Sequence, residues 1–191
     1  MNKTAITAAP IMPVLAERWS PRSYDATHEV SNHDLTSILE AARWAPSANN
    51  GQPWRFSVAK RGSELHSKIV AGLSGFNAAW SPAASAYVVV SILKTHADGS
   101  EYRSAAYDAG LAVANLTIQA QELGLHTHQM MGIDHAAIHA SLGLDPNLAV
   151  LVIVTLGKVA PAEQLEGPAY EREIQPRVRH SLDEIVLHGK P

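Results

Sequence analysis

The chain has 191 residues, 46% of them hydrophobic and 17% charged, which is the composition of a single globular domain or of one subunit of an obligate dimer. Its formal net charge of -3 provides no basic surface for nucleic acid or for an anionic membrane, so we expect neither as a partner. The chain contains no cysteine, which excludes disulfides, thiolate nucleophiles and cysteine-ligated metals, so any redox chemistry needs a cofactor.

The N-terminal segment has the pattern of neither a signal peptide nor a membrane anchor. Pro10 and Pro13 interrupt the apolar core that a signal peptide requires, and no run in the chain approaches about 18 apolar residues. We therefore expect a cytoplasmic protein in which residues 1–13 are flexible. A short helix is predicted at residues 14–19.

Residues 18–22 form a basic segment that is predicted to be extended. Arg18, Ser20 and Arg22 occupy alternate positions, so their side chains point to one side. Two guanidinium groups and a hydroxyl suit a phosphate or another anionic edge. A solvated basic loop is the alternative that these residues by themselves leave open.

A helix is predicted from the N-cap Ser31 to Ala42, and it ends before Pro46. The polar loop that follows, residues 47–52, carries hydroxyl and amide side chains and lies between Pro46 and Pro53, which limit its backbone freedom. Such a loop can bind a flat, polar ligand, although Ser, Asn and Gly clusters are also ordinary turn residues.

The rest of the chain alternates between predicted strands and helices. Residues 85–93 are rich in β-branched side chains and too apolar for a half-exposed strand, so we place them centrally in a sheet. Further strands are predicted at residues 54–60, 125–131 and 149–156, and further helices at residues 63–73, 101–123 and 134–142.

The helix at residues 101–123 has apolar or small side chains on several faces rather than along one stripe. We expect it to be buried nearly all round, packed on the sheet and against a partner subunit, with Gly110 and Ala114 permitting close approach. A core helix of a monomer is the alternative.

A tail rich in proline and charge begins at Gly157 and Lys158, which lack the glycine spacing and the Ser or Thr of a phosphate-binding P-loop. Arg177 and Arg179 again stand at alternate positions, so an extended tail would point both to one side. Solvated arginines are the usual alternative.

Several of these segments resemble motifs of the FMN-dependent nitroreductase family and occur in the same order. The loop matches a P-S-x-x-N-x-Q-P-W pattern from Pro46 to Trp54, downstream of the R-x-S-x-R pattern at residues 18–22. The long helix resembles the D-x-G-x-A-x-x-N-L pattern from Asp108 to Leu116, and Arg177 and Arg179 resemble the basic pair before a C-terminal L-x-E-I segment. The resemblance covers roughly residues 18–186.

The resemblance implies an α+β, nitroreductase-like fold with a mostly antiparallel central sheet flanked by helices. The whole chain, residues 1–191, would form one domain, and residues 158–191 would be a C-terminal extension in a domain-swapped type of homodimer. Each of two shared active sites would then be built from both chains.

The resemblance also implies a cofactor, FMN, and the residues that bind it. Arg18 and Ser20 would contact the phosphate and ribityl chain, Arg22 the N1/C2=O edge of the ring, and the backbone of Met131 and Gly132 the N5/O4 edge. Two departures weaken the pattern: Trp80 and Ser81 replace a basic residue, and Met131 replaces an acidic one. The complete predicted set is Arg18, Trp19, Ser20, Arg22, Pro46, Ser47, Ala48, Asn50, Gln52, Asn77, Met131, Gly132, Arg177 and Arg179.

The implied activity is an FMN-dependent NAD(P)H oxidoreductase with a ping-pong mechanism. A hydride would pass from NADH or NADPH to flavin N5 and then to a nitroaromatic, quinone or related small-molecule acceptor. No side chain is predicted to be catalytic, because the cofactor carries the electrons while the protein supplies position and charge.

Two other classes of function are open at this point. The pairs His126 with His128 and His135 with His139 each share one face of an element, and four imidazoles could bind zinc or nickel in a metal-dependent hydrolase or a metal-binding protein. Neither pair has the H-E-x-x-H spacing of a zinc protease. A dimer that only stores or carries flavin is the third class.

Overall fold

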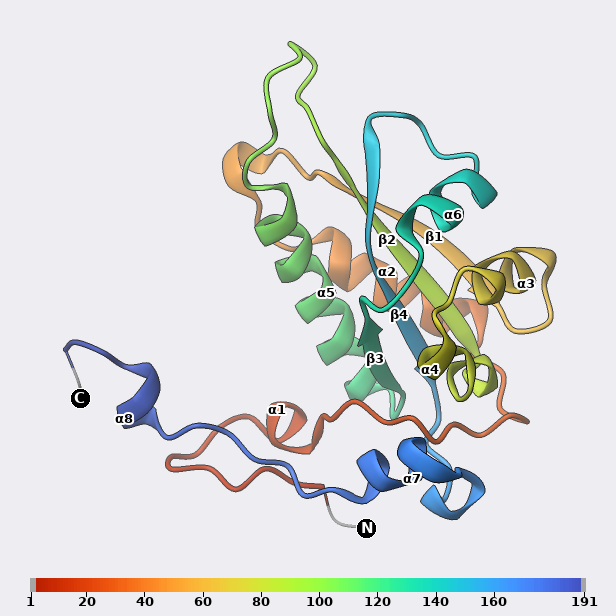
Figure 1. Cartoon of the computed structure of the whole chain (residues 1–191). Coiled ribbons are helices and arrows are strands. Elements are labelled where there is room, and N and C mark those ends of the chain that lie inside the picture. The colour runs from red at the N-terminus through yellow and green to blue at the C-terminus, as the bar shows by residue number, and fades with distance from the viewer. Residues whose placement is uncertain (1–2, 190–191) are drawn as a thin grey trace.

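The computed structural model describes residues 3–189, and its centre is a four-stranded sheet of order β1-β2-β4-β3 (Figure 1). Every pair of neighbouring strands is antiparallel, which confirms the expected sheet. The strands are β1 (Trp54–Lys60), β2 (Ala86–Leu93), β3 (His126–Met130) and β4 (Leu148–Gly157).

Strand β2 lies centrally, as its composition predicted, because it pairs with β1 on one side and β4 on the other. Val88 and Val90 point into one hydrophobic core and Tyr87 and Val89 into a second core on the opposite face of the sheet, and all four are fully buried. The sheet therefore separates two cores, and a strand buried on both faces needs apolar residues at every position.

Helices α2 (Asn32–Arg43) and α5 (Ala105–Glu122) cover one face of the sheet and pack against each other. The Ser31 side chain accepts the Asp34 N–H, so the predicted N-cap is confirmed. Helix α5 begins four residues later than the predicted start at residue 101, because Glu101 forms a β-bridge with Thr95 and closes a loop instead.

Helix α5 is not buried all round within one chain, so its expected burial against a partner subunit stays a prediction. Ala106, Gly110 and Ala114 form an exposed stripe, and Tyr107 beside them is 72% exposed. The opposite face, with Ala112 and Leu116, is buried in the core, so the helix is apolar on more sides than one chain covers.

Helices α3 (Glu64–Ala71), α4 (Gly75–Ala78) and α6 (His135–Ser141) lie on the other side of the sheet (Figure 1). The predicted helix of residues 63–73 ends at Ala71, and a second short helix, α4, begins at Gly75. Gly72 lies against α6: a Cβ there would be 2.5 Å from Cγ1 of Ile138, so a larger residue would push the helices apart.

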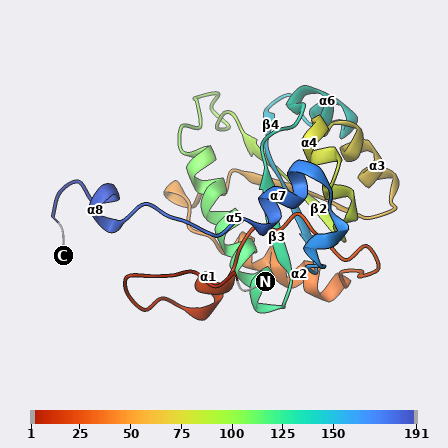
Figure 2. The ribbon, with the colours of Figure 1, turned by 60° about the horizontal axis from the view of Figure 1, so that its bottom comes forward.

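The two ends of the chain run side by side across the bottom of the sheet (Figures 1 and 2). Lys3 Nζ donates to the carbonyls of Glu173 and Gln175 at 2.6 Å each, and an Arg177 Nη1 donates to the carbonyl of Lys3 at 2.6 Å. Helix α1 (Pro13–Glu17) ends before Trp19, so the predicted helix of residues 14–19 is shorter and Arg18 is already extended.

The tail contains two α-helices that the sequence pattern did not indicate. Helix α7 (Gly167–Ile174) docks on the body, where Ala169 and Glu173 are buried, and α8 (Leu182–Ile185) lies away from the body (Figure 2). The remaining short elements are η1 (Ala48–Asn50), η2 (Ser81–Ala83) and η3 (Ala162–Gln164). No helix in the described residues is long and apolar enough to cross a membrane.

Candidate cofactor site

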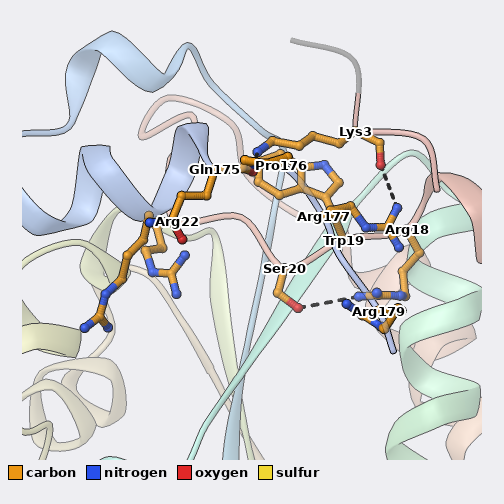
Figure 3. A pocket seen from close by; sticks show the side chains of 10 residues that line it. Lys3, Arg18, Trp19, Ser20, Arg22, Gln175, Pro176, Arg177 and Arg179 are labelled. Carbon is orange, nitrogen blue, oxygen red and sulfur yellow. Dashed lines mark hydrogen bonds between the residues drawn. The ribbon is translucent and has the colours of Figure 1, made fainter. Parts of the chain in front are cut away.

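A cationic cleft forms where the N-terminal segment meets the C-terminal tail (Figure 3). Its volume of about 370 Å³ lies within the range of small-molecule sites. Arg18, Ser20 and Arg22 all line it, as predicted, but Trp19 between them lines it too, so the segment does not alternate strictly. The full lining is Lys3, Arg18, Trp19, Ser20, Arg22, Arg172, Gln175, Pro176, Arg177 and Arg179.

One end of the cleft, which we call the cationic end, gathers Arg18, Arg177 and Arg179 around Ser20 (Figure 3). An Arg18 Nη1 lies 3.5 Å from the Ser20 Oγ. Burial lowers the pKa of Arg18, and the positive charges of Arg177 and Arg179 lower it further. No acidic side chain of residues 3–189 lines the cleft, so this cluster holds positive charge that an anion such as a phosphate would neutralise.

The other end, which we call the ring end, is lined by Arg22, whose guanidinium packs on two aromatic rings that lie behind the lining. The Arg22 guanidinium carbon lies 5.8 Å from the ring centroid of Phe76 and 6.0 Å from that of Trp80. Figure 3 shows Arg22 on the opposite side of Ser20 from Arg18 and Arg179. The Nε of Arg22 and the Nε1 of Trp80 are buried, and neither has a hydrogen-bond partner among the described residues.

The residues predicted to lie near flavin N5, Asn77, Met131 and Gly132, are not part of the cleft lining. The Asn77 Nδ2 donates to the carbonyl of Gly132 at 2.9 Å, and the Ser74 hydroxyl donates to the same oxygen. Asn77 directly follows Phe76, whose ring borders the ring end. These bonds hold the main chain at Gly132, while the Met131 side chain is 66% exposed.

The predicted loop residues Pro46, Ser47, Ala48, Asn50 and Gln52 do not line the cleft of their own chain. Their backbone is unusual, because the φ angles of Asn49, Asn50 and Gln52 are 49°, 54° and 48°, in the left-handed region.

Two anchors hold this loop in place. The carboxylate of buried Asp108 accepts the Ala48 N–H at 3.3 Å, and the Ser47 hydroxyl accepts the Gln52 N–H at 3.1 Å. Three non-glycine residues held in this conformation cost energy, and such strain gathers at ligand-binding sites.

Comparison with known proteins gives the chain its family. The model of the Nitroreductase family matches residues 15–78 and 73–158, which together cover well over half of the chain. The chain belongs to the nitroreductase family. Residues of the cationic end at 177 and 179 lie beyond the matched ranges.

Individual relatives agree with this assignment. A solved structure described as an oxidoreductase containing FMN is 33% identical, covers 97% of this chain and 95% of its own, and has a TM-score of 0.91. The oxygen-insensitive NADPH nitroreductase of Helicobacter pylori strain J99 is 35% identical over 120 residues, which are 62% of this chain and 56% of that protein. An uncharacterized 15.4 kDa protein of Mycolicibacterium smegmatis is 31% identical over 143 residues, 71% of this chain and 96% of that protein.

The two histidine pairs named in the sequence do not assemble into one cluster among the described residues. His135 Nδ1 lies 2.9 Å from the carbonyl of Val150, and His139 Nε2 lies 3.2 Å from that of Asp145, so each is bonded locally. His128 is directed at the carbonyl of Pro21 instead. Among residues 3–189 no three or more His, Cys, Asp or Glu are grouped to hold a metal, so the metal-binding alternative has no support.

Sequence reasoning missed three groups at this site. Lys3 and Arg172 line the cleft, and Glu173 lies behind it with only 2% exposure. None belongs to a motif of the family. The sequence feature that could have indicated them is the run of three charged residues at 171–173. If the helix that carries them docks, some of the three must face solvent and others the interior.

Proposed function

We propose that this nitroreductase binds FMN in the cleft, with the phosphate at the cationic end and the isoalloxazine at the ring end, and that it oxidises NADH or NADPH. The observation that carries the proposal is the division of the cleft. Arg18 and Arg22 lie on opposite sides of Ser20 in one segment, and Arg177 and Arg179 of the tail lie at the Arg18 end. FMN has the same order of groups as the cleft: a dianionic phosphate for the cationic end, an uncharged ribityl chain, and a flat ring for the ring end.

FMN would supply the redox chemistry, because its N5 accepts a hydride from the nicotinamide and gives it to an acceptor such as a nitroaromatic or a quinone in a ping-pong sequence. The protein's part is binding and charge. Arg18, Arg177 and Arg179 would neutralise the phosphate, and Ser20 would donate to it. The Arg22 guanidinium would favour negative charge at the pyrimidine edge of the ring.

We propose further that two chains associate and complete each other's sites. The exposed stripe of Ala106, Gly110 and Ala114 on α5 is small enough for close helix contact. Apolar side chains of the tail are also uncovered, with exposures of 53% for Leu182, 61% for Ile185 and 78% for Leu187. A partner would cover both surfaces, and it would bring its own strained loop of residues 47–52 to the cleft.

The test is the absorption spectrum of the purified protein after incubation with FMN and removal of free flavin. We expect a bound flavin spectrum at one FMN per chain, bleached anaerobically by NADH or NADPH and restored by a nitroaromatic or a quinone. Initial rates at several acceptor concentrations should give parallel double-reciprocal lines. A protein that binds no FMN contradicts the proposal, and one whose bound FMN neither nicotinamide reduces is a flavin carrier.

A further inference from the structure

We propose that Arg172 is a second cation of the ring end, which acts with Arg22 on the pyrimidine edge of the flavin and so favours binding of the reduced cofactor over the oxidised one. This inference rests on the proposed FMN site. It assigns a role to a residue that lies outside every motif of the sequence and outside the residues matched by the family model.

The first observation is that Arg172 and Arg22 share one aromatic platform. The guanidinium carbon of Arg172 lies 4.4 Å from the ring centroid of Phe76, and that of Arg22 lies 5.8 Å from the same centroid. Both side chains line the cleft. The Phe76 ring orients each planar cation through its π face, so both charges border one end of the cleft.

The second observation is that neither guanidinium is paired with a carboxylate. Glu173 is the acid next to them, but its two oxygens accept the backbone N–H groups of Arg22 and Ser23 at 2.7 and 3.2 Å. The structure gives no salt bridge for either arginine among residues 3–189. Two positive charges therefore face a space that holds no protein anion.

The third observation is that the repulsion between the two arginines is built into the fold. Burial lowers the pKa of Arg22, and the charge of Arg172 lowers it further, while Glu173 opposes both. Helix α7 nevertheless keeps Arg172 in place, because the neighbouring Glu173 is buried and bonded to the segment that carries Arg22. A fixed arrangement of like charges needs no reorganisation when negative charge develops beside it.

The ligand group that fits two adjacent arginines is a ring edge with neighbouring acceptor atoms whose negative charge increases on reduction. The pyrimidine edge of a flavin, with N1 and the C2 carbonyl, is such a group. Arg22 and Arg172 both line the cleft, and Arg172 is the more exposed residue of the two.

The experiment compares Arg172→Met and Arg172→Lys with the wild type. Lys68→Met is the control, because it removes one positive charge from an exposed position of α3 outside the cleft. The readouts are the dissociation constant of oxidised FMN, the midpoint potential of bound FMN by dye equilibration, and the circular dichroism spectrum to verify folding. None depends on turnover.

We expect Arg172→Met to weaken binding of reduced FMN about three- to tenfold more than binding of oxidised FMN, which corresponds to a fall in midpoint potential of about 15–30 mV. Arg172→Lys keeps the charge and should retain most of the potential, and Lys68→Met should match the wild type. If the midpoint potential of FMN bound to Arg172→Met equals that of FMN bound to Lys68→Met, the inference is overturned. A wild-type protein that binds no FMN overturns the proposed function and this inference together.

Discussion

The carboxylate of Glu173 accepts the backbone N–H of Arg22 at 2.7 Å, although 151 positions of the chain separate the two residues. The second oxygen accepts the N–H of Ser23 at 3.2 Å, and the Glu173 side chain is buried. Burial raises the pKa of Glu173, while the two backbone N–H groups and the charges of Arg22 and Lys3 oppose that rise. The tail is thus hydrogen-bonded to the segment that carries Arg18, Ser20 and Arg22.

The first prediction concerns this link. Glu173→Ala leaves two backbone N–H groups without an acceptor and should reduce the free energy of unfolding by about 1–3 kcal/mol. Glu173→Gln keeps one acceptor oxygen and should cost less. Urea titrations with and without FMN measure both effects, and FMN affinity should fall in the Ala variant. Glu171→Ala, at an exposed position of the same helix, is the control. Equal stability of the two Ala variants would show that the link contributes nothing.

The second prediction concerns the close approach of Gly51 to Tyr102. A Cβ on Gly51 would overlap the Tyr102 hydroxyl and lie 2.8 Å from its Cζ, so Gly51→Ala should destabilise the fold by about 1–3 kcal/mol. That hydroxyl is buried without a partner, so Tyr102→Phe by itself should be nearly neutral.

The double variant tests the mechanism, because removing the hydroxyl relieves the closest contact. We expect Gly51→Ala with Tyr102→Phe to be more stable than Gly51→Ala by itself, as a positive coupling in a double-mutant cycle. Thermal unfolding of the four proteins gives the coupling directly. Strict additivity would mean that the loop moves away from Tyr102 rather than pressing on it.

The third prediction is a pH dependence due to His128. Burial lowers the pKa of His128 from 6.5 to about 4, and Nδ1 lies 2.9 Å from the carbonyl of Pro21, where the neutral ring donates. The folded state therefore takes up a proton less readily than the unfolded state, and stability is lost as the pH falls from 6.5 towards 4. The resulting loss in the free energy of unfolding is about 2 kcal/mol between pH 7 and pH 5.

The comparison is between the wild type and His128→Asn, with urea unfolding at pH 7 and pH 5. The variant should lose about 2 kcal/mol less than the wild type over this interval, since asparagine does not titrate. Burial also lowers the pKa of His126 and of His66, but both residues are present in both proteins and their terms cancel. Equal losses in the two proteins would mean that His128 is protonated in the folded state.

The fourth prediction tests the shared sites of the proposed dimer. Arg18→Ala removes a charge of the cationic end, and Asn50→Asp changes the loop that the partner would supply, so each variant by itself should be inactive. Co-expression should restore activity, because a mixed dimer rebuilds one intact site. Random pairing makes about half of the dimers mixed and gives about a quarter of wild-type activity.

Light scattering at micromolar concentration should give the mass of a dimer for the wild type and for both variants. Separate affinity tags on the two chains verify that mixed dimers have formed. A monomeric mass, or mixed dimers that have no activity, would contradict the shared-site arrangement. The matched control pairs Arg18→Ala with Arg179→Ala. These two variants should not complement, because each chain of the mixed dimer then has a defective cationic end of its own.

Local patterns in the sequence were sufficient for the sheet and for most of the helices. The apolar run at residues 85–93 indicated a central strand, and β2 is buried on both faces because a strand between two cores has no solvent side. Alternation predicted that Arg18, Ser20 and Arg22 share one side, and all three line one cleft, although Trp19 lines it as well. Periodicity carries this information because it depends only on neighbours in the chain.

The sequence by itself therefore determined the sheet, most of the helices before the tail, the family and one wall of the cleft. Only the tertiary structure decided the other wall, because the positions of Lys3 and Arg172 depend on where helix α7 docks. Three consecutive charged residues in α7 look equally solvated in the sequence, yet docking exposes Glu171, turns Arg172 to the cleft and buries Glu173. Contacts between the two ends of the chain have no local period, and their energies arise from burial and hydrogen bonds that exist only after folding.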